Sequence, residues 1–126
     1  MQWRILQHKK SDDFVVSTGK QYSVKFFVER CCSYLGIKLK WSGKGLNEVG
    51  TITNFNSKKT PSLKKGMKII KIDKKYFRPL DVDNLIGDAK KAEKILKWKP
   101  KTKINQLIER MMKSDLIYVK QSTKML

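Results

Sequence analysis

The fold is decided by residues 23–41, SVKFFVERCCSYLGIKLKW, where the spacing of apolar residues changes from a helical to a strand-like period. Ser23 is a typical helix N-cap, and the apolar residues after it share one helical face. They are Val24, Phe27, Val28, Cys31 and Leu35. Gly36 can supply the left-handed residue that ends a helix. From Ile37 to Trp41 apolar residues alternate with lysines, which predicts a strand with one solvent-facing side.

The same patterns predict further elements on both sides of this stretch. Before it, residues 14–17, FVVS, form a short apolar run that predicts a buried strand ending at a Thr-Gly pair. After it, residues 42–45 predict a turn, and residues 50–55 and 68–73 predict strands. The lysine-rich segment 57–66, with a proline inside, predicts the loop between them.

Two helices are predicted near the C-terminus. Asp88 can cap the first, which would bury Ala92, Ile95 and Leu96 and end before Pro100. Thr102 can cap the second, whose apolar stripe would contain Ile104, Leu107, Ile108 and Met111. We expect a frayed tail at residues 121–126, and an α/β domain over residues 1–120 with a small sheet and about three helices.

Charge is the most conspicuous feature of the composition. The 126 residues carry a net charge of +18, and only four of the 29 basic residues are arginine. Such charge attracts nucleic acid, anionic membranes or phosphate-bearing ligands. Base-reading surfaces favour arginine, however, and the lysines here are spread along the chain rather than gathered in one block. An AT-rich genome also produces an excess of lysine at surface positions. A small lysine-rich nucleic-acid-binding protein therefore remains an alternative, with specific nucleic-acid binding not expected.

Several kinds of site lack support in the sequence. His8 is the only histidine, and the adjacent Cys31 and Cys32 lack partners for a metal site or a set of disulfides, so we expect no metal ligands and a reduced, cytoplasmic protein. No apolar run is long enough to span a membrane or to act as a secretion signal. One cysteine should lie in the core and the other be partly exposed. We expect the tryptophans in the core: Trp3, Trp41 and Trp98.

Two motifs of nucleotide-binding enzymes are matched only in part. Tyr34 and Lys38 have the Tyr-x-x-x-Lys spacing, but Gly36 between them should end the helix on which both would have to lie. The glycines at 43, 45 and 50 have the wrong spacing for a dinucleotide loop, and no helix should follow them. The sequence therefore predicts no catalytic and no cofactor-binding residues in this chain.

The strongest candidate for binding is residues 76–82, YFRPLDV. Arg78 stands three residues before Asp81, beside a rigid proline. A guanidinium can hold a diphosphate through forked, charge-assisted hydrogen bonds, and a carboxylate can accept from ribose hydroxyls. The pair predicts a nucleotide-sugar site. A basic run with aromatics, residues 74–78, is also compatible with stacking on bases, and Arg78 could instead form an ion pair with Asp81 or Asp83.

The chain resembles the C-terminal third of the GDP-mannose 4,6-dehydratases, which belong to the extended short-chain dehydrogenases. The resemblance rests on short blocks in the same order. They are DFVVSTG (13–19), QYSV (21–24), FVE (27–29), LGIKL (35–39), YFRP (76–79), LIGD (85–88), Lys91-Ala92 and WKP (98–100). The first two point most narrowly to this family, whereas the Arg-Pro and Trp-x-Pro blocks occur widely among nucleotide-sugar enzymes.

This resemblance implies a substrate-binding portion without its N-terminal Rossmann domain. It implies that Arg78 contacts the GDP diphosphate and Asp81 the ribose. The family converts GDP-mannose to GDP-4-keto-6-deoxy-mannose, on the way to GDP-fucose, by an internal redox elimination that uses NADP. Its cofactor loop and catalytic residues precede the matched region. The implied protein binds no NADP and is inactive alone, and an NADP-binding half would have to act in trans.

Three departures from the family pattern stand out. Asp81 replaces a glutamate, which shortens the reach toward a ribose. Lys97 replaces a glycine before the tryptophan, which would cost roughly 1 kcal/mol if the backbone there is left-handed. The loop from Lys58 to Lys68 is more basic than in the family.

Overall fold

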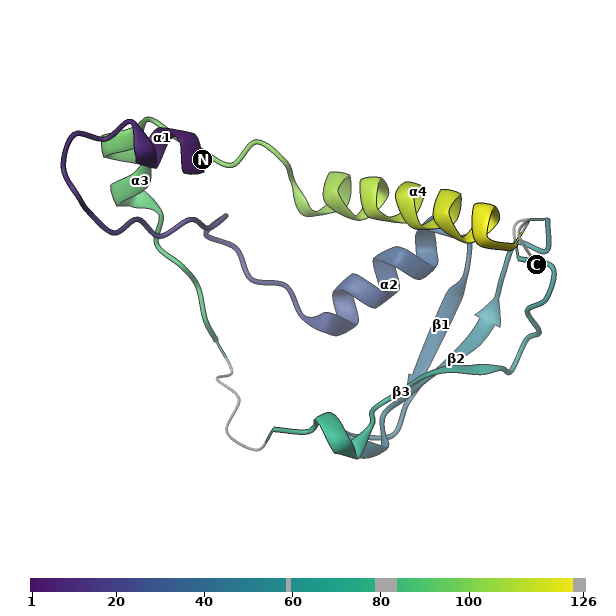
Figure 1. Ribbon diagram of the computed structural model, residues 1–126. Helices are drawn as coiled ribbons and strands as arrows, with labels where there is room; N and C mark the ends of the chain where they lie inside the picture. The colour runs from purple at the N-terminus through teal and green to yellow at the C-terminus, as the bar shows by residue number, and fades with distance from the viewer. Residues whose placement is uncertain (59, 79–83, 124–126) are drawn as a thin grey trace. The chain divides into compact units, whose positions relative to one another are not determined.

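The computed structural model describes residues 1–58, 60–78 and 84–123. The chain forms two compact units, which we describe separately. Unit 1 contains residues 1–22 and 82–103, and unit 2 contains residues 23–81 and 104–126. Figure 1 shows their helices and strands.

In unit 2, helix α2 spans Val24–Tyr34 and begins where the sequence predicts. The hydroxyl of Ser23 accepts a hydrogen bond from the Phe26 amide at 3.1 Å, which is an N-cap. The helix ends at Leu35 and at Gly36, whose φ of +76° only glycine adopts without strain. Helix α2 packs against strand β1 and helix α4 (Figure 1), so the predicted helix and its stop are confirmed.

Three antiparallel strands form the sheet of unit 2 in the order β1-β2-β3. They are β1 (Lys38–Ser42), β2 (Val49–Asn54) and β3 (Lys68–Lys71), and a short 3-10 helix, Gly45–Asn47, connects the first two. Exposed and half-buried residues alternate along β1, as the lysine alternation predicts. The three strand predictions in this region are therefore confirmed within about two residues at each end.

The core of unit 2 lies between this sheet and its helices. Its buried residues are Cys32, Ile37 and Ile52, and half-buried apolar residues pack around them. In α4 (Ile104–Thr123) Ile108 is buried, but Leu107 and Met111 are exposed, so the buried stripe of α4 is narrower than predicted. Val24, in the first turn of α2, is also exposed rather than buried. Helix α4 continues through Thr123, three residues into the segment 121–126 for which the sequence predicts a frayed tail.

Unit 1 contains two short helices, α1 (Gln2–Leu6) and α3 (Lys90–Leu96). The Asp88 carboxylate accepts from the Lys90 amide at 2.9 Å, so it bonds the first turn of α3 as predicted, but the N-cap position is Ala89, one residue later than predicted. Ala92 and Leu96 are buried because residues four apart share one helical face. Ile95 lies off that face and is exposed, so its predicted burial is wrong.

Other predictions for unit 1 are wrong as well. Residues 14–17 belong to no strand, since they have no sheet partner among the described residues. Trp3 is 70% exposed, because α1 buries none of its residues, whereas Trp41 and Trp98 are half-buried. His8 is half-buried and meets the Phe14 ring edge-on. Across the described residues, no helix is both long enough and apolar enough to cross a membrane.

Candidate functional site

Arg78 lies at the end of a rigid turn in unit 2. The turn is a 3-10 helix, Lys74–Tyr76, and the Asp73 carboxylate caps it by accepting from the Lys75 amide at 2.9 Å. Among the described residues, Arg78 has no ion pair or hydrogen bond, and its side chain is exposed. No other described residue therefore pairs with this guanidinium. Asp81, its predicted partner, and Asp83 lie outside the described residues.

Two exposed aromatic side chains precede Arg78. Tyr76 and Phe77 present their rings to solvent, and the Lys75 ammonium lies 5.7 Å from the centre of the Tyr76 ring. A flat apolar surface beside an exposed guanidinium suits a ligand that has both a ring and a phosphate. This arrangement is compatible with the nucleotide-sugar prediction for Arg78.

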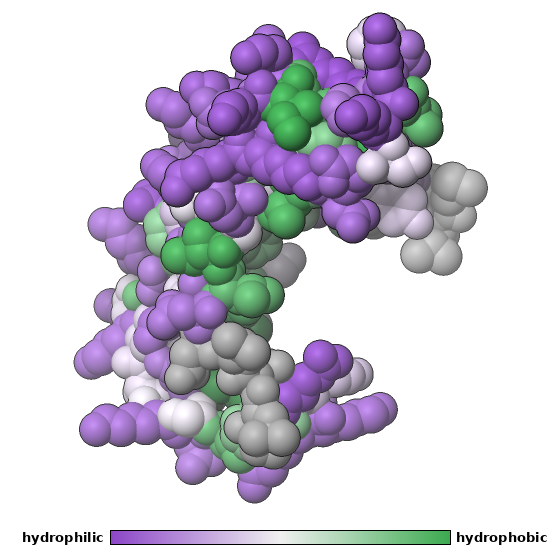
Figure 2. Space-filling model, turned by 90° about the vertical axis from the view of Figure 1, so that its left-hand side faces the viewer, coloured by the Kyte–Doolittle hydropathy of each residue, from purple (hydrophilic) through white to green (hydrophobic). Residues whose placement is uncertain are grey.

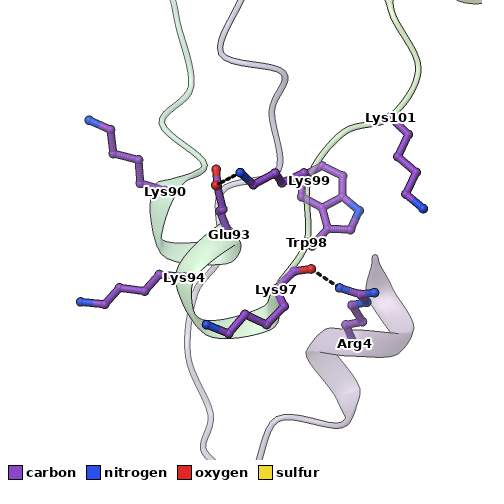
Figure 3. Close-up of a pocket in the computed structure, with 8 residues that line it drawn as sticks. All are labelled: Arg4, Lys90, Glu93, Lys94, Lys97, Trp98, Lys99 and Lys101. Carbon is purple, nitrogen blue, oxygen red and sulfur yellow. Dashed lines mark hydrogen bonds and ion pairs between the residues drawn. The ribbon is translucent and has the colours of Figure 1, made fainter.

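Unit 1 contains a basic depression that the sequence analysis did not single out (Figure 3). It is open, with a volume of about 1160 Å³. Its lining has six basic side chains, Glu93 and the Trp98 ring; the basic residues are Arg4, Lys90, Lys94, Lys97, Lys99 and Lys101. Glu93 forms an ion pair with Lys99 (Figure 3). In the sequence, only the density of lysines in residues 90–101 indicates this depression. The spacing of residues alone could not show that Arg4 also lines it.

Arg4 and Lys97 fix the backbone at one side of this depression. The Arg4 Nη1 donates to the carbonyl oxygens of Leu96 at 2.9 Å and Lys97 at 2.5 Å, so it satisfies carbonyls that the end of α3 leaves unpaired (Figure 3). Lys97 has a φ of +50° and is the C-cap of α3 in the left-handed conformation. The backbone at Lys97 is therefore left-handed, which is the condition under which a lysine at this position costs stability.

Neither cysteine is placed as a nucleophile. Cys32 is buried and Cys31 is half-buried, as predicted for one core and one partly exposed thiol. Burial raises the pKa of Cys32, helped by the nearby Cys31 and Glu29, and burial together with Asp115 raises the pKa of Cys31. Both are therefore protonated near neutral pH. Within the described parts of the chain, no group of three histidine, cysteine or acidic residues could hold a metal ion.

The described residues do not fit NADP. Gly43 and Gly45, both at positive φ, form the tight connection between β1 and β2, and a Cβ on Gly43 would lie 2.1 Å from the Asn47 carbonyl oxygen. Gly50 packs in the sheet against Ile70. A dinucleotide loop instead connects a parallel strand to a helix N-terminus. Tyr34 ends α2 while Lys38 begins β1, so these two do not share a helical face.

Comparison with known proteins identifies the family. A family model described as GDP-mannose 4,6 dehydratase matches residues 1–111. The chain belongs to the GDP-mannose 4,6-dehydratase family. Among curated members of this family, the chain is 40% identical to a GDP-mannose 4,6-dehydratase of Vibrio cholerae over 116 residues, which is 92% of the chain and 31% of the relative.

Eukaryotic members of the dehydratase family match at slightly lower identity. The chain is 38% identical to the GDP-mannose 4,6 dehydratase of Dictyostelium discoideum over 97% of the chain and 32% of the relative. It is 38% identical to the Homo sapiens protein of the same name over 90% of the chain and 28% of the relative. The chain therefore spans about a third of the length of these dehydratases. The resemblance found in the sequence is confirmed.

Proposed function

We propose that this chain is the GDP-sugar-binding, C-terminal portion of a GDP-mannose 4,6-dehydratase. In this role it holds GDP-mannose while an NADP-binding portion, which the chain does not contain, converts it to GDP-4-keto-6-deoxy-mannose. The family match over residues 1–111, which includes the Arg-Pro block, carries the proposal. The two free cysteines fit a reducing, cytoplasmic location.

Arg78 is the principal binding residue in this proposal. Its guanidinium would bind the diphosphate through two parallel hydrogen bonds, a geometry that lysine cannot reproduce. Because Arg78 is exposed and has no ion pair with another described residue, no such pair has to break before the ligand binds. Asp81 would accept from the ribose hydroxyls, at shorter reach than a glutamate.

Catalysis by the chain alone is not expected. Tyr34 and Lys38 lie on different elements, and the glycines at 43 and 45 serve a turn. We therefore derive no hydride or elimination step from these residues. The proposal assigns to this chain the binding and orientation of the sugar nucleotide.

Titration calorimetry with GDP-mannose tests the proposal. Arg78→Ala should weaken binding at least tenfold, in line with the loss of a charge-assisted contact of about 1.5–3 kcal/mol. Arg78→Lys should recover only part of the loss, and Asp81→Glu should bind GDP-mannose more tightly than the unmodified chain. Arg110→Ala, which removes an exposed arginine on α4, is the matched control. Equal affinity for Arg78→Ala and Arg110→Ala would refute the role of Arg78.

The basic depression in unit 1 supports a second candidate, electrostatic binding of nucleic acid. Its six cations surround one carboxylate, which Lys99 already pairs, and Trp98 offers a half-buried ring. Binding of this kind weakens steeply with salt. A fluorescent oligonucleotide titrated at several salt concentrations tests it, with a paired Lys94→Glu and Lys101→Glu variant as the probe. No saturable binding at physiological salt would exclude this candidate.

A further inference from the structure

The basic depression of unit 1 contains a tryptophan as well as cations. Among the described residues, six basic side chains, one carboxylate and the Trp98 ring line it. Figure 2 shows hydrophilic residues over most of the face in view, so charge alone does not distinguish the depression from other surfaces of the chain. The half-buried indole does, because the other described residues that line the depression are exposed and charged. Trp98 therefore offers a ligand a flat apolar surface among cations.

Three of the cations have no partner among the described residues. Lys94, Lys97 and Lys101 form neither an ion pair nor a hydrogen bond with another described residue. Lys99, by contrast, is paired with Glu93. Anions bound among the three lysines would relieve the repulsion between their charges. The depression therefore suits a ligand with several negative charges.

Arg4 is held in place at the edge of the depression. Its Nη1 donates to the Leu96 carbonyl oxygen at 2.9 Å and to the Lys97 carbonyl oxygen (Figure 3). A guanidinium has five N–H donors, so the remaining donors of Arg4 can bind a phosphate. Because these two bonds already fix the side chain, a phosphate can bind it with little loss of side-chain entropy.

The size and layout of the depression favour an elongated ligand. Sites for small molecules usually have volumes of about 300–1,000 Å³ and enclose most of the ligand. This depression is open and has a volume of about 1160 Å³. Figure 3 shows the Lys90 and Lys94 ammonium groups on one side of it and the Trp98 ring with Lys101 on the other. A polymer that crosses the depression can contact both sides, whereas a compact anion cannot.

A polymer that carries both phosphates and flat rings is a nucleic acid. In a duplex every base is paired and stacked, so none can lie on the Trp98 ring without first leaving the stack. In a single strand, bases can stack directly on an aromatic side chain, while cations follow the backbone. Anionic membranes and acidic proteins supply the charge, but they lack a regular series of rings for the indole.

We infer that the depression binds single-stranded nucleic acid, with one base stacked on Trp98. The phosphates are held by four cations: Arg4, Lys94, Lys97 and Lys101. The chemistry recognised is a phosphodiester backbone with unstacked bases, which both DNA and RNA provide. This inference rests on the second candidate function, because it concerns the same depression. It goes beyond that candidate by naming the strandedness of the ligand and the residue that contacts its bases.

Fluorescence anisotropy with labelled probes tests the inference. The probes are a mixed-sequence DNA strand of roughly 12 nucleotides, an RNA strand of the same sequence and the DNA duplex, lengths within the usual site size. The two strands distinguish DNA from RNA as the source of the ligand. Charge alone would favour the duplex, which has the higher charge density. We therefore expect at least one strand to bind about fivefold or more tightly than the duplex at physiological salt.

Two results would contradict the inference in different ways. A duplex that binds as tightly as both strands would overturn the stacking on Trp98 and leave the electrostatic candidate standing. No saturable binding of any probe at physiological salt would overturn the electrostatic candidate as well. GDP-mannose is absent from these titrations, so they are independent of the role proposed for Arg78.

Substitutions in the depression separate stacking from charge. Trp98→Leu should weaken binding of the preferred strand at least about fivefold without changing its salt dependence, and Trp98→Phe should recover part of the loss. Lys94→Ala and Lys101→Ala should each reduce the magnitude of the slope of log K against log salt by about 0.7, the value for one phosphate of a single strand. Unchanged slopes in both lysine variants would overturn the assignment of the phosphate contacts.

Two further aromatic variants locate the site. Trp3→Leu is the matched control, since Trp3 is 70% exposed in unit 1 and is not among the described residues that line the depression. Equal weakening by Trp3→Leu and Trp98→Leu would overturn the assignment of Trp98. So would a loss produced by Tyr76→Leu alone, because the exposed Tyr76 belongs to the basic run of unit 2.

Discussion

Arg4 holds the carbonyl oxygen of Lys97 at 2.5 Å, at the one described non-glycine residue with a left-handed backbone. The same Nη1 bonds the Leu96 carbonyl, so a side chain from α1 completes the end of α3. The resemblance to the dehydratases implies a glycine at this position. The contact with Arg4 therefore secures a conformation that lysine adopts only with strain.

Replacing Lys97 by glycine should stabilise the chain. The left-handed conformation costs a side chain about 1–2 kcal/mol, and part of the gain is offset because glycine loses more entropy on folding. We expect Lys97→Gly to raise the free energy of unfolding by about 0.5–1 kcal/mol, measured by urea denaturation. Lys94→Gly, inside α3, should lower it by about 1 kcal/mol. A loss of stability in Lys97→Gly would show that the lysine side chain contributes more than the strain costs.

Adding a methyl group at Gly87 should destabilise unit 1. The new Cβ would lie 2.8 Å from the Ser17 Cβ, closer than real side chains approach. We expect Gly87→Ala to cost about 1–3 kcal/mol, the usual range for overpacking. In a Ser17→Gly background the same change should cost clearly less, because the clashing atoms are gone. Equal costs in the two backgrounds would mean that the strain arises elsewhere.

Removing the cap of α2 should destabilise unit 2. Ser23→Ala deletes the acceptor of the Phe26 amide and should cost about 1 kcal/mol in the free energy of unfolding. Ser23→Asp should retain most of the stability, since aspartate also caps helices well. Ser33→Ala, at an exposed position of the same helix, is the control. If the Ser23→Ala and Ser33→Ala variants unfold alike, the cap does not stabilise α2.

Asp12 should make stability depend on pH in the acid range. The Lys91 ammonium, 2.5 Å from its carboxylate, and the Asp13 amide lower the pKa of Asp12. A carboxylate with a lowered pKa in the folded state stabilises that state above its unfolded pKa of about 4, and the contribution disappears as the pH falls through the folded value. Unfolding of Asp12→Asn between pH 6 and 2 should therefore depend less on pH than unfolding of the unmodified chain.

The Asp12 effect should be small and sensitive to salt, because both partners are partly exposed. Glu109, whose pKa the Lys113 ammonium also lowers, provides the comparison in unit 2. Identical acid unfolding of the Asp12→Asn variant and the unmodified chain at low salt would rule out the proposed contribution.

Features that depend on neighbours within a helical turn could be predicted from the sequence. The cap at Ser23, the stop at Gly36 and the alternation along β1 each depend on residues a few positions apart. The left-handed backbone of Lys97 was only a condition in the sequence analysis, and the structure meets it. In these places, local chemistry decides the structure.

Features that depend on distant residues were predicted wrongly or were missed. Residues 14–17 have the sequence of a strand, but pairing requires a partner that local sequence cannot reveal. The exposure of Leu107 and Ile95 depends on how wide a face each helix presents to its unit. The basic depression joins Arg4 to residues more than 80 positions later, so spacing could not predict it. The predicted pairing of Arg78 with Asp81 remains a prediction.

The placement of the thiols has a practical consequence. Both cysteines of the chain lie in unit 2, and Cys32 is enclosed in its core beside Ile37 and Ile52. A thiol reagent can therefore modify Cys32 only when that core opens, and unit 1 contributes no thiol to the signal. The rate of Cys32 modification therefore measures how often the core of unit 2 opens. In a Trp41→Phe variant the remaining tryptophans, Trp3 and Trp98, lie in unit 1, so their fluorescence measured beside this rate would reveal whether the two units unfold together or one after the other.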